Sequence, residues 1–161
     1  MEKMKHLIIY YSYTNHTREL VKRLQNKFSY DVFEIEPVIP YSNNYQQVVD
    51  EAERDVPRGV QPEIKPFTLD LEQYDVIILA TPVWWYTFAS PVNTFLHQYR
   101  LQGKIIIPLV TNGGWIGHTI EDIERLSGGT IQNPISVKFD GDRLVDEALF
   151  EKWMERVGES K

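Results

Sequence analysis

Residues 74 to 96 read YDVIILATPVWWYTFASPVNTFL, and this stretch decides the fold class. From Asp75 to Thr81 the residues are almost all apolar, which is typical of a strand buried on both faces of a parallel sheet. A helix is predicted from Pro91 to Tyr99, because proline favours the first turn of a helix and apolar residues follow at helical spacing. Those apolar residues are Val92, Phe95 and Leu96. A buried strand followed by an amphipathic helix is the repeating unit of an α/β protein.

The same unit recurs along the chain and predicts five strand and helix pairs. Further strands are predicted at residues 6–12, 32–36, 104–110 and 131–139. Further amphipathic helices are predicted at residues 17–28, 45–56 and 119–126, with a closing helix lined by Val145, Leu149, Trp153 and Val157. Residues 57–71 show no clear period and are interpreted as an irregular connection. This alternation predicts a doubly wound, five-stranded parallel sheet with helices on both faces.

Length and composition indicate one ordinary globular domain. A chain of 161 residues is long enough to bury a core, so we expect a single domain over residues 1–161. The net charge of −6 argues against nucleic-acid binding, which needs clustered Lys and Arg. No apolar run approaches the roughly 20 residues of a spanning helix, so we expect no membrane insertion and a cytoplasmic location.

Cysteine is absent and the four histidines are scattered along the chain. Without thiols, any redox activity must come from a bound cofactor. The histidine spacing suggests no metal site.

The first candidate binding loop follows the strand at residues 6–12 and opens the next helix. It contains Ser12, Tyr13, Thr14, Asn15, His16 and Thr17. Unpaired N–H groups and the positive end of the helix dipole make such a position an anion site, and the hydroxyl groups add donors. A hydroxyl that merely caps the helix is the alternative interpretation. The glycine patterns of a Walker loop and of a dinucleotide fold are both missing here.

The second loop, residues 81–88, carries Trp84, Trp85, Tyr86 and Phe88 just past the strongest strand. Such a cluster is either core or a wall for a ligand. Indoles exposed where the chain leaves a sheet favour contact with a flat conjugated ligand, with Phe88 assigned to the core.

The third loop, residues 111–117, follows the strand at residues 104–110 and contains Gly113 and Gly114. Paired glycines let the backbone approach a ligand closely and present N–H groups to it. A tight turn explains the glycines equally well when this loop is considered alone. Three such loops at neighbouring strand ends favour one shared site.

The chain resembles the flavodoxin family, and in particular its short bacterial flavodoxin-like branch. The resemblance rests on YYSYTNHT at residues 10–17, on a helical insertion at residues 41–55, on the stretch quoted first, and on GKIIIPLVTNGGWIGHTIEDIERL at residues 103–126. It implies the strand order 2-1-3-4-5 and one non-covalently bound FMN. In that order the switch point lies between strands 1 and 3, and flavodoxin with its FMN is itself the standard example of a ligand bound there.

The resemblance also implies the residues that hold FMN. Ser12 to Thr17 would hold the phosphate, while Pro82 to Tyr86 and Asn112 to Gly117 would flank the ring. The predicted FMN-binding residues are therefore Ser12, Tyr13, Thr14, Asn15, His16, Thr17, Pro82, Val83, Trp84, Trp85, Tyr86, Thr111, Asn112, Gly113, Gly114, Trp115 and Gly117. No catalytic acid or base is predicted.

Three positions depart from the family pattern. Asn15 stands where flavodoxins commonly have Gly, and Asn tolerates the left-handed backbone better than other non-glycine residues. Tyr86 and Trp115 stand where this branch often has Gly and Ser. These two aromatic side chains would stack on the flavin or narrow the access to it.

The resemblance implies electron transfer through FMN, and the leading hypothesis is a carrier between redox protein partners. The alternative is an FMN-dependent NAD(P)H:quinone or azo reductase with a small quinone-like substrate, for which Tyr86 and Trp115 would wall a pocket. A third interpretation is a module without redox activity, since fold does not dictate function. The sequence sets no oligomeric state.

Overall fold

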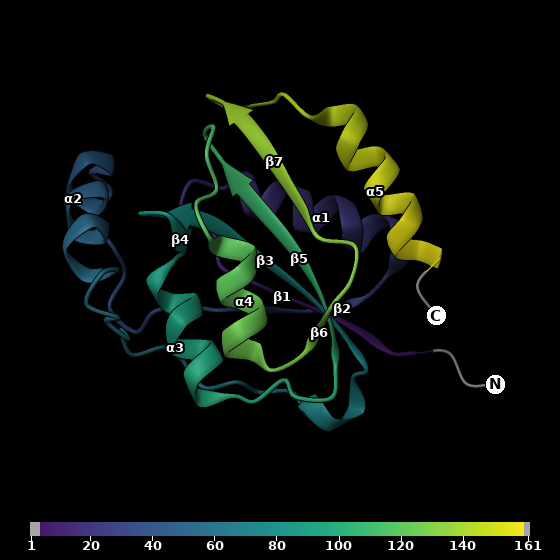
Figure 1. The fold of residues 1–161 in the computed structure, drawn as a ribbon. Helices are drawn as coiled ribbons and strands as arrows, with labels where there is room; N and C mark the ends of the chain where they lie inside the picture. The colour runs from purple at the N-terminus through teal and green to yellow at the C-terminus, as the bar shows by residue number, and fades with distance from the viewer. Residues whose placement is uncertain (1–3, 160–161) are drawn as a thin grey trace.

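The computed structural model describes residues 4–159, which form one sheet with helices against both faces (Figure 1). The strands are β1 (His6–Tyr10), β2 (Asp31–Glu34), β3 (Val76–Trp84), β4 (Thr87–Phe88), β5 (Ile105–Asn112), β6 (Thr130–Ile131), β7 (Ile135–Asp140) and β8 (Arg143–Leu144). The helices are α1 (His16–Phe28), α2 (Tyr45–Asp55), α3 (Ser90–Gln98), α4 (Thr119–Ser127) and α5 (Glu147–Glu159), with a 3₁₀ turn at Leu71–Gln73.

The sheet has the order β2-β1-β3-β5-β7, with all neighbouring pairs in this series parallel. In register, Ile8 of β1 lies between Val32 of β2 and Ile78 of β3, and Ile78 lies opposite Ile107 of β5. This confirms the predicted order of the five main strands. Three two-residue strands add to this series: β4 pairs with β3, β6 with β5 and β8 with β7. β4 and β8 were not predicted.

The side chains of the central strands alternate between two cores. Leu7 and Ile9 belong to the core under α3 and α4, whereas Ile8 belongs to the core under α1 and α5. Full burial of each such side chain stabilises the fold by about 1.5–3 kcal/mol. The largest side chains that the helices bury are Phe95 from α3, and Phe150 and Trp153 from α5. The two cores explain why the central strands are apolar without interruption.

Most predicted elements lie within about two residues of their observed bounds, but three predictions need correction. β3 continues to Trp84, so the first half of the predicted second loop is strand. The strand predicted at residues 131–139 is divided into β6 and β7, because Asn133 has a left-handed φ of 46° and Pro134 has no N–H to donate. Val145 and Leu149 are exposed, so they do not belong to the buried face of the closing helix.

None of the helices within residues 4–159 is long and apolar enough to cross a membrane.

Candidate functional site

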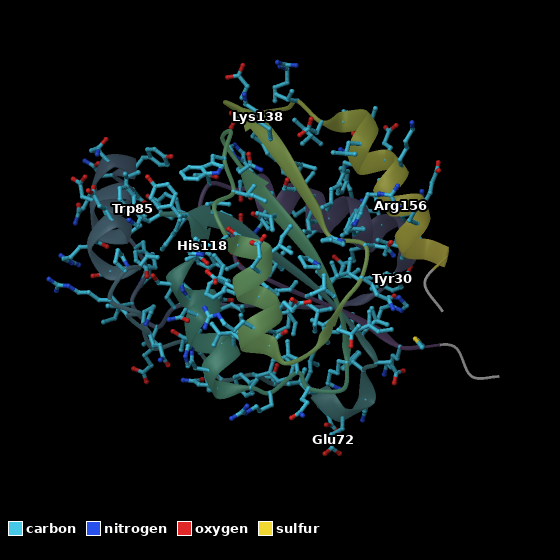
Figure 2. The ribbon with its side chains drawn as sticks, in the orientation of Figure 1. Tyr30, Glu72, Trp85, His118, Lys138 and Arg156 are labelled. Atoms are coloured by element: carbon cyan, nitrogen blue, oxygen red, sulfur yellow. The ribbon has the colours of Figure 1, made fainter. Side chains whose placement is uncertain are left out.

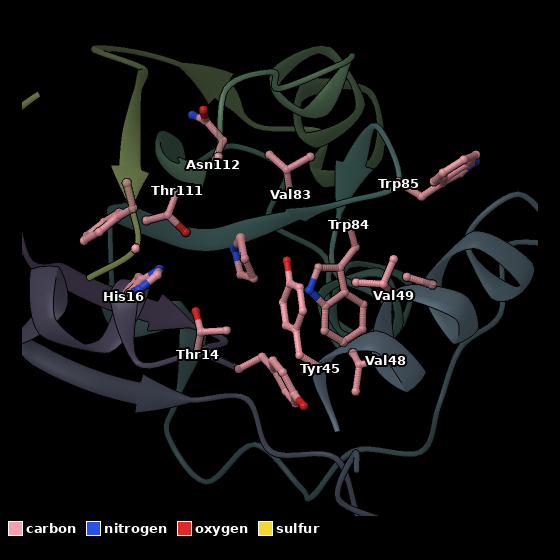
Figure 3. A pocket seen from close by; sticks show the side chains of 16 residues that line it. Thr14, His16, Tyr45, Val48, Val49, Val83, Trp84, Trp85, Thr111 and Asn112 are labelled. Carbon is pink, nitrogen blue, oxygen red and sulfur yellow. The ribbon is translucent and has the colours of Figure 1, made fainter. Parts of the chain in front are cut away.

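A cleft of about 530 Å³ opens at the carboxyl ends of β1, β3 and β5 (Figure 3). Its volume lies within the roughly 300–1,000 Å³ typical of small-molecule sites. In Figure 3, Thr14, Trp84 and Asn112 approach it from three separate segments of chain. The cleft therefore lies where the order of a doubly wound sheet reverses, between β1 and β3, which is the usual ligand position in such folds.

The cleft brings together part of each predicted loop. The predicted residues that line it are Tyr13, Thr14, His16, Pro82, Val83, Trp84, Trp85, Thr111, Asn112 and Gly113. The predicted residues that lie outside its lining are Ser12, Asn15, Thr17, Tyr86, Gly114, Trp115 and Gly117. In this second group, Ser12, Asn15 and Thr17 make hydrogen bonds within the first loop or between the first and third loops.

The start of α1 presents unpaired donors to the cleft. Its N-cap, Asn15, has a left-handed φ of 74° and makes no side-chain capping bond, while Ser12 Oγ accepts the Arg18 N–H at 3.2 Å. Within residues 4–159, the N–H groups of residues 13–17 have no hydrogen-bond partner. Such groups, together with the helix dipole, attract an anion. The capping interpretation holds for Ser12, and the loop still keeps free donors.

Arg18 fixes the unusual backbone of this loop. Its guanidinium donates to Asn15 Oδ1 at 2.6 Å and to Glu34 Oε2. A left-handed residue other than glycine costs roughly 1–2 kcal/mol, and the hydrogen bond from Arg18 opposes that cost. Hydrogen bonds with Tyr10 and Glu34 outweigh burial and raise the pKa of Arg18 further, so the guanidinium stays charged and is paired with the Glu34 carboxylate.

A buried hydrogen bond links the first loop to the third. Thr17 Oγ1 and Thr111 Oγ1 are 2.9 Å apart, and both residues are almost fully buried. The Thr17 hydroxyl therefore lies behind the cleft, whereas Thr111 lines it. This hydrogen bond fixes the position of the first loop relative to the third.

His16 connects the first loop to the end of β7. Its ring stacks on Phe139 at 4.3 Å, and its Nε2 lies 3.1 Å from Asp142 Oδ1. Phe139 and Gly141 line the cleft and were not predicted to do so. They could have been predicted from their place at the end of the fifth predicted strand, because the carboxyl ends of parallel strands lie at the same edge of the sheet.

Trp84 forms a fixed aromatic wall. It is only 9% exposed, and it makes edge contacts with Tyr11 at 5.5 Å, Tyr13 at 6.3 Å and Tyr41 at 5.0 Å. Burial, with the nearby carboxylates of Asp55 and Glu51, raises the pKa of Tyr41 to about 12, so this hydroxyl is neutral at physiological pH. Trp85 lies apart at the rim of the cleft (Figure 3).

Trp85 and Tyr86 form the two-residue turn between β3 and β4. Both have a left-handed backbone, with φ of 46° and 72°, in a turn where Asn-Gly is the usual pair. The Tyr86 carbonyl accepts the His118 N–H at 2.8 Å, and the Tyr86 ring lies against Trp115 at 4.6 Å. A Cβ on Gly117 would lie 2.1 Å from the Tyr86 oxygen. Gly117 is therefore needed for the second and third loops to meet.

The helix α2 forms an unpredicted wall of the cleft. Tyr45, Val48, Val49 and Ala52 line it from this helix. Their helical spacing was recognised in the sequence, but an apolar helix face does not distinguish core from cleft. Tyr45 is well exposed, whereas Val48 is buried against the core.

Comparisons with known proteins agree with this architecture. A family model described as flavodoxin matches residues 5–157. A candidate flavoprotein from Bacteroides eggerthii superposes with a TM-score of 0.79 at 23% identity, covering 97% of this chain and 99% of that one. A flavoprotein in complex with FMN from Lactobacillus acidophilus gives a TM-score of 0.71 at 23% identity, covering 94% of this chain and 99% of that one. Identities this low show the fold alone.

A curated relative matches a shorter stretch of the sequence. FMN reductase (NADPH) from Escherichia coli is 39% identical over 62 residues, which are 37% of this chain. The match spans 32% of that protein's length.

Proposed function

We propose that this chain, which belongs to the flavodoxin family, binds one FMN non-covalently in the cleft described above and acts as an electron-transfer flavoprotein. The observation that carries the proposal is the meeting of an uncapped helix start with an aromatic wall at the switch point of the sheet. An anion site beside a flat apolar surface matches a phosphate joined to a conjugated ring.

The phosphate would lie at the start of α1. The N–H groups of residues 13–17, which have no hydrogen-bond partner within residues 4–159, belong to this segment, and Thr14 and His16 of the same segment line the cleft. No Lys or Arg lines the cleft in the part of the chain that the structure describes. Backbone donors and the helix dipole would therefore supply most of the attraction.

The ring would lie between the β3 end and the third loop. Asn112 Nδ2 donates to the Val137 carbonyl at 3.2 Å, and Asn112 Oδ1 accepts the Gly114 N–H at 2.9 Å. These bonds fix the turn that carries Gly113, whose backbone lines the cleft. Bound FMN supplies the redox chemistry, while the chain orients the ring and sets its surroundings.

Two roles remain to be distinguished for this cofactor. A carrier between redox protein partners needs an accessible ring edge, and the exposed side chain of Trp85 at the rim of the cleft supports this role. The partial match to FMN reductase (NADPH) supports the alternative, an NAD(P)H:quinone or azo reductase with a small quinone-like substrate. The cytoplasmic location expected from the sequence stays a prediction.

The visible spectrum of the purified protein tests the proposal. We expect a flavin band that survives gel filtration after FMN is added. No retained flavin, even at saturating FMN, would contradict the proposal. Anaerobic NADPH oxidation then separates the two roles: rapid NADPH-dependent turnover of a quinone supports the reductase, whereas slow turnover with fast exchange of electrons to a redox protein supports the carrier.

A further inference from the structure

A second cavity, of about 520 Å³, is lined by the β3–β4 turn, by the segment that follows α2 and by residues of α3 and α4. Trp85 lines both this cavity and the cofactor cleft. In Figure 2, Trp85 lies beside α2 and His118 lies beside α4. The proposed function does not use this cavity.

The cavity combines aromatic and apolar walls. Trp85 and Tyr86 form one side, with ring centroids 4.8 Å apart, and Phe88 lies beneath them. Val56 and Val60 approach from the segment that follows α2. These surfaces suit a planar aromatic ring, which would stack on Trp85 or Tyr86.

The single carboxylate that lines the cavity is already satisfied. Asp122 accepts hydrogen bonds from Thr87 Oγ1 at 2.7 Å, from Arg125 Nη2 at 3.1 Å and from His118 Nδ1. Burial opposes its ionisation, but the three donors outweigh burial and lower its pKa. Asp122 is thus a fixed anion with its oxygens occupied, and it holds the two basic side chains in place.

Arg125, His118 and His97 add hydrogen-bond donors to the lining of the cavity. Arg125 uses one of its donors for Asp122, and a guanidinium has five. His118 binds Asp122 through Nδ1, which leaves its Nε2, and His97 adds a third basic side chain from α3. In a chain with a net charge of −6, this local excess of donors favours a ligand with a negative group.

We propose that this second cavity is a binding site for a planar aromatic anion, such as an aromatic carboxylate. The ring would pack against Trp85 and Tyr86, and the acidic group would accept hydrogen bonds from Arg125 and His118. Because Trp85 is shared, the ligand would lie one side chain from the cofactor cleft without entering it.

Calorimetric titration with two matched probes tests this site. Naphthalene-2-carboxylate carries the charge, and naphthalene-2-carboxamide has the same shape without it. We expect the carboxylate to bind the FMN-saturated protein more tightly than the amide. Because FMN fills the first cleft in this experiment, competition between FMN and the carboxylate would place the probe in the first cleft and overturn the proposal.

Variants identify the residues that are responsible. Arg125→Gln should weaken carboxylate binding about fivefold and leave amide binding within about twofold, since it removes one exposed charge-assisted contact. His97→Trp, on an exposed helix position, should fill the cavity and abolish binding of both probes. Arg100→Gln removes the same charge from an exposed position outside both cavities and should change neither affinity.

Carboxylate binding that is absent, or equal in the wild type and in both cavity variants, would refute the site. Visible absorbance and thermal melts of each variant confirm that the fold and FMN binding are retained. If the protein binds no FMN, the proposed function fails, but the same titrations on the FMN-free chain still decide whether this cavity binds the anion.

Discussion

Gly117→Ala provides the sharpest test of how the second and third loops meet. Gly117 has φ 57°, and a Cβ at this position would lie 2.1 Å from the Tyr86 carbonyl oxygen. The obstacle is backbone, so no side-chain rotation relieves it. The turn would have to move, and the hydrogen bond from the His118 N–H to Tyr86 would be lost with it.

Gly103→Ala is the matched control. Gly103 also has a positive φ, of 83°, but a Cβ there would meet nothing within 4 Å. Both substitutions carry the roughly 1–2 kcal/mol cost of a left-handed alanine. Gly117→Ala adds overpacking of about 1–3 kcal/mol and a lost hydrogen bond of about 1 kcal/mol. We therefore expect about 3–6 kcal/mol of destabilisation for Gly117→Ala, against about 1–2 kcal/mol for the control.

Urea unfolding of the two variants and the wild type measures this difference, provided that the m-value is unchanged. An FMN titration should show weaker binding only for Gly117→Ala, because the displaced turn carries Trp85 at the rim of the cleft. Equal losses of unfolding free energy in the two variants would refute the reasoning, since they would show that the Tyr86 carbonyl does not confine position 117.

Three further predictions concern the first loop and the far end of the sheet. Thr14→Val should weaken FMN binding about tenfold and riboflavin binding little, because it removes one donor to a charged phosphate; equal losses for both ligands would exclude Thr14 from the phosphate site. Thr17→Val should instead lower the free energy of unfolding by about 1–3 kcal/mol, measured in urea, because it leaves the buried Thr111 hydroxyl unpaired. Burial lowers the pKa of His6 below its ordinary value of 6.5, although the Met4 carbonyl and Asp75 act in the opposite direction. Below about pH 6.5 the unfolded chain therefore binds a proton at His6 more readily than the folded chain does, so the free energy of unfolding decreases as the pH falls. His6→Phe should flatten this part of the stability curve; an unchanged slope between about pH 5 and pH 7 would contradict it.

The strands and helices could be predicted because the spacing of apolar residues along the sequence indicates each of them. Continuous apolar runs such as residues 75–81 mark strands with both faces buried, and the helices between them show clear amphipathic spacing. The sequence also indicates that Asn15 tolerates a left-handed backbone, and in the structure it has a φ of 74°.

The remaining features depend on contacts between distant residues. The extension of β3 to Trp84 depends on its pairing with β4. The two-residue turn at Trp85 and Tyr86 contains none of the Asn or Gly residues that normally indicate such a turn in a sequence. The hydrogen bond between Thr17 and Thr111 joins residues 94 apart in sequence. For α2, the apolar face was visible, but its role as a wall of the cleft depends on where tertiary packing places the helix.

The brace between Arg18 and Asn15 makes the two positions an epistatic pair. With the glycine that the family resemblance leads one to expect at position 15, the left-handed backbone needs no support, so substitutions at Arg18 would act through its contacts with Tyr10 and Glu34. With asparagine, the same substitutions also release the loop. Position 18 is therefore expected to tolerate fewer residues when position 15 is asparagine than when it is glycine, and the Glu34 carboxylate on β2 contributes to this restriction by holding Arg18 in place.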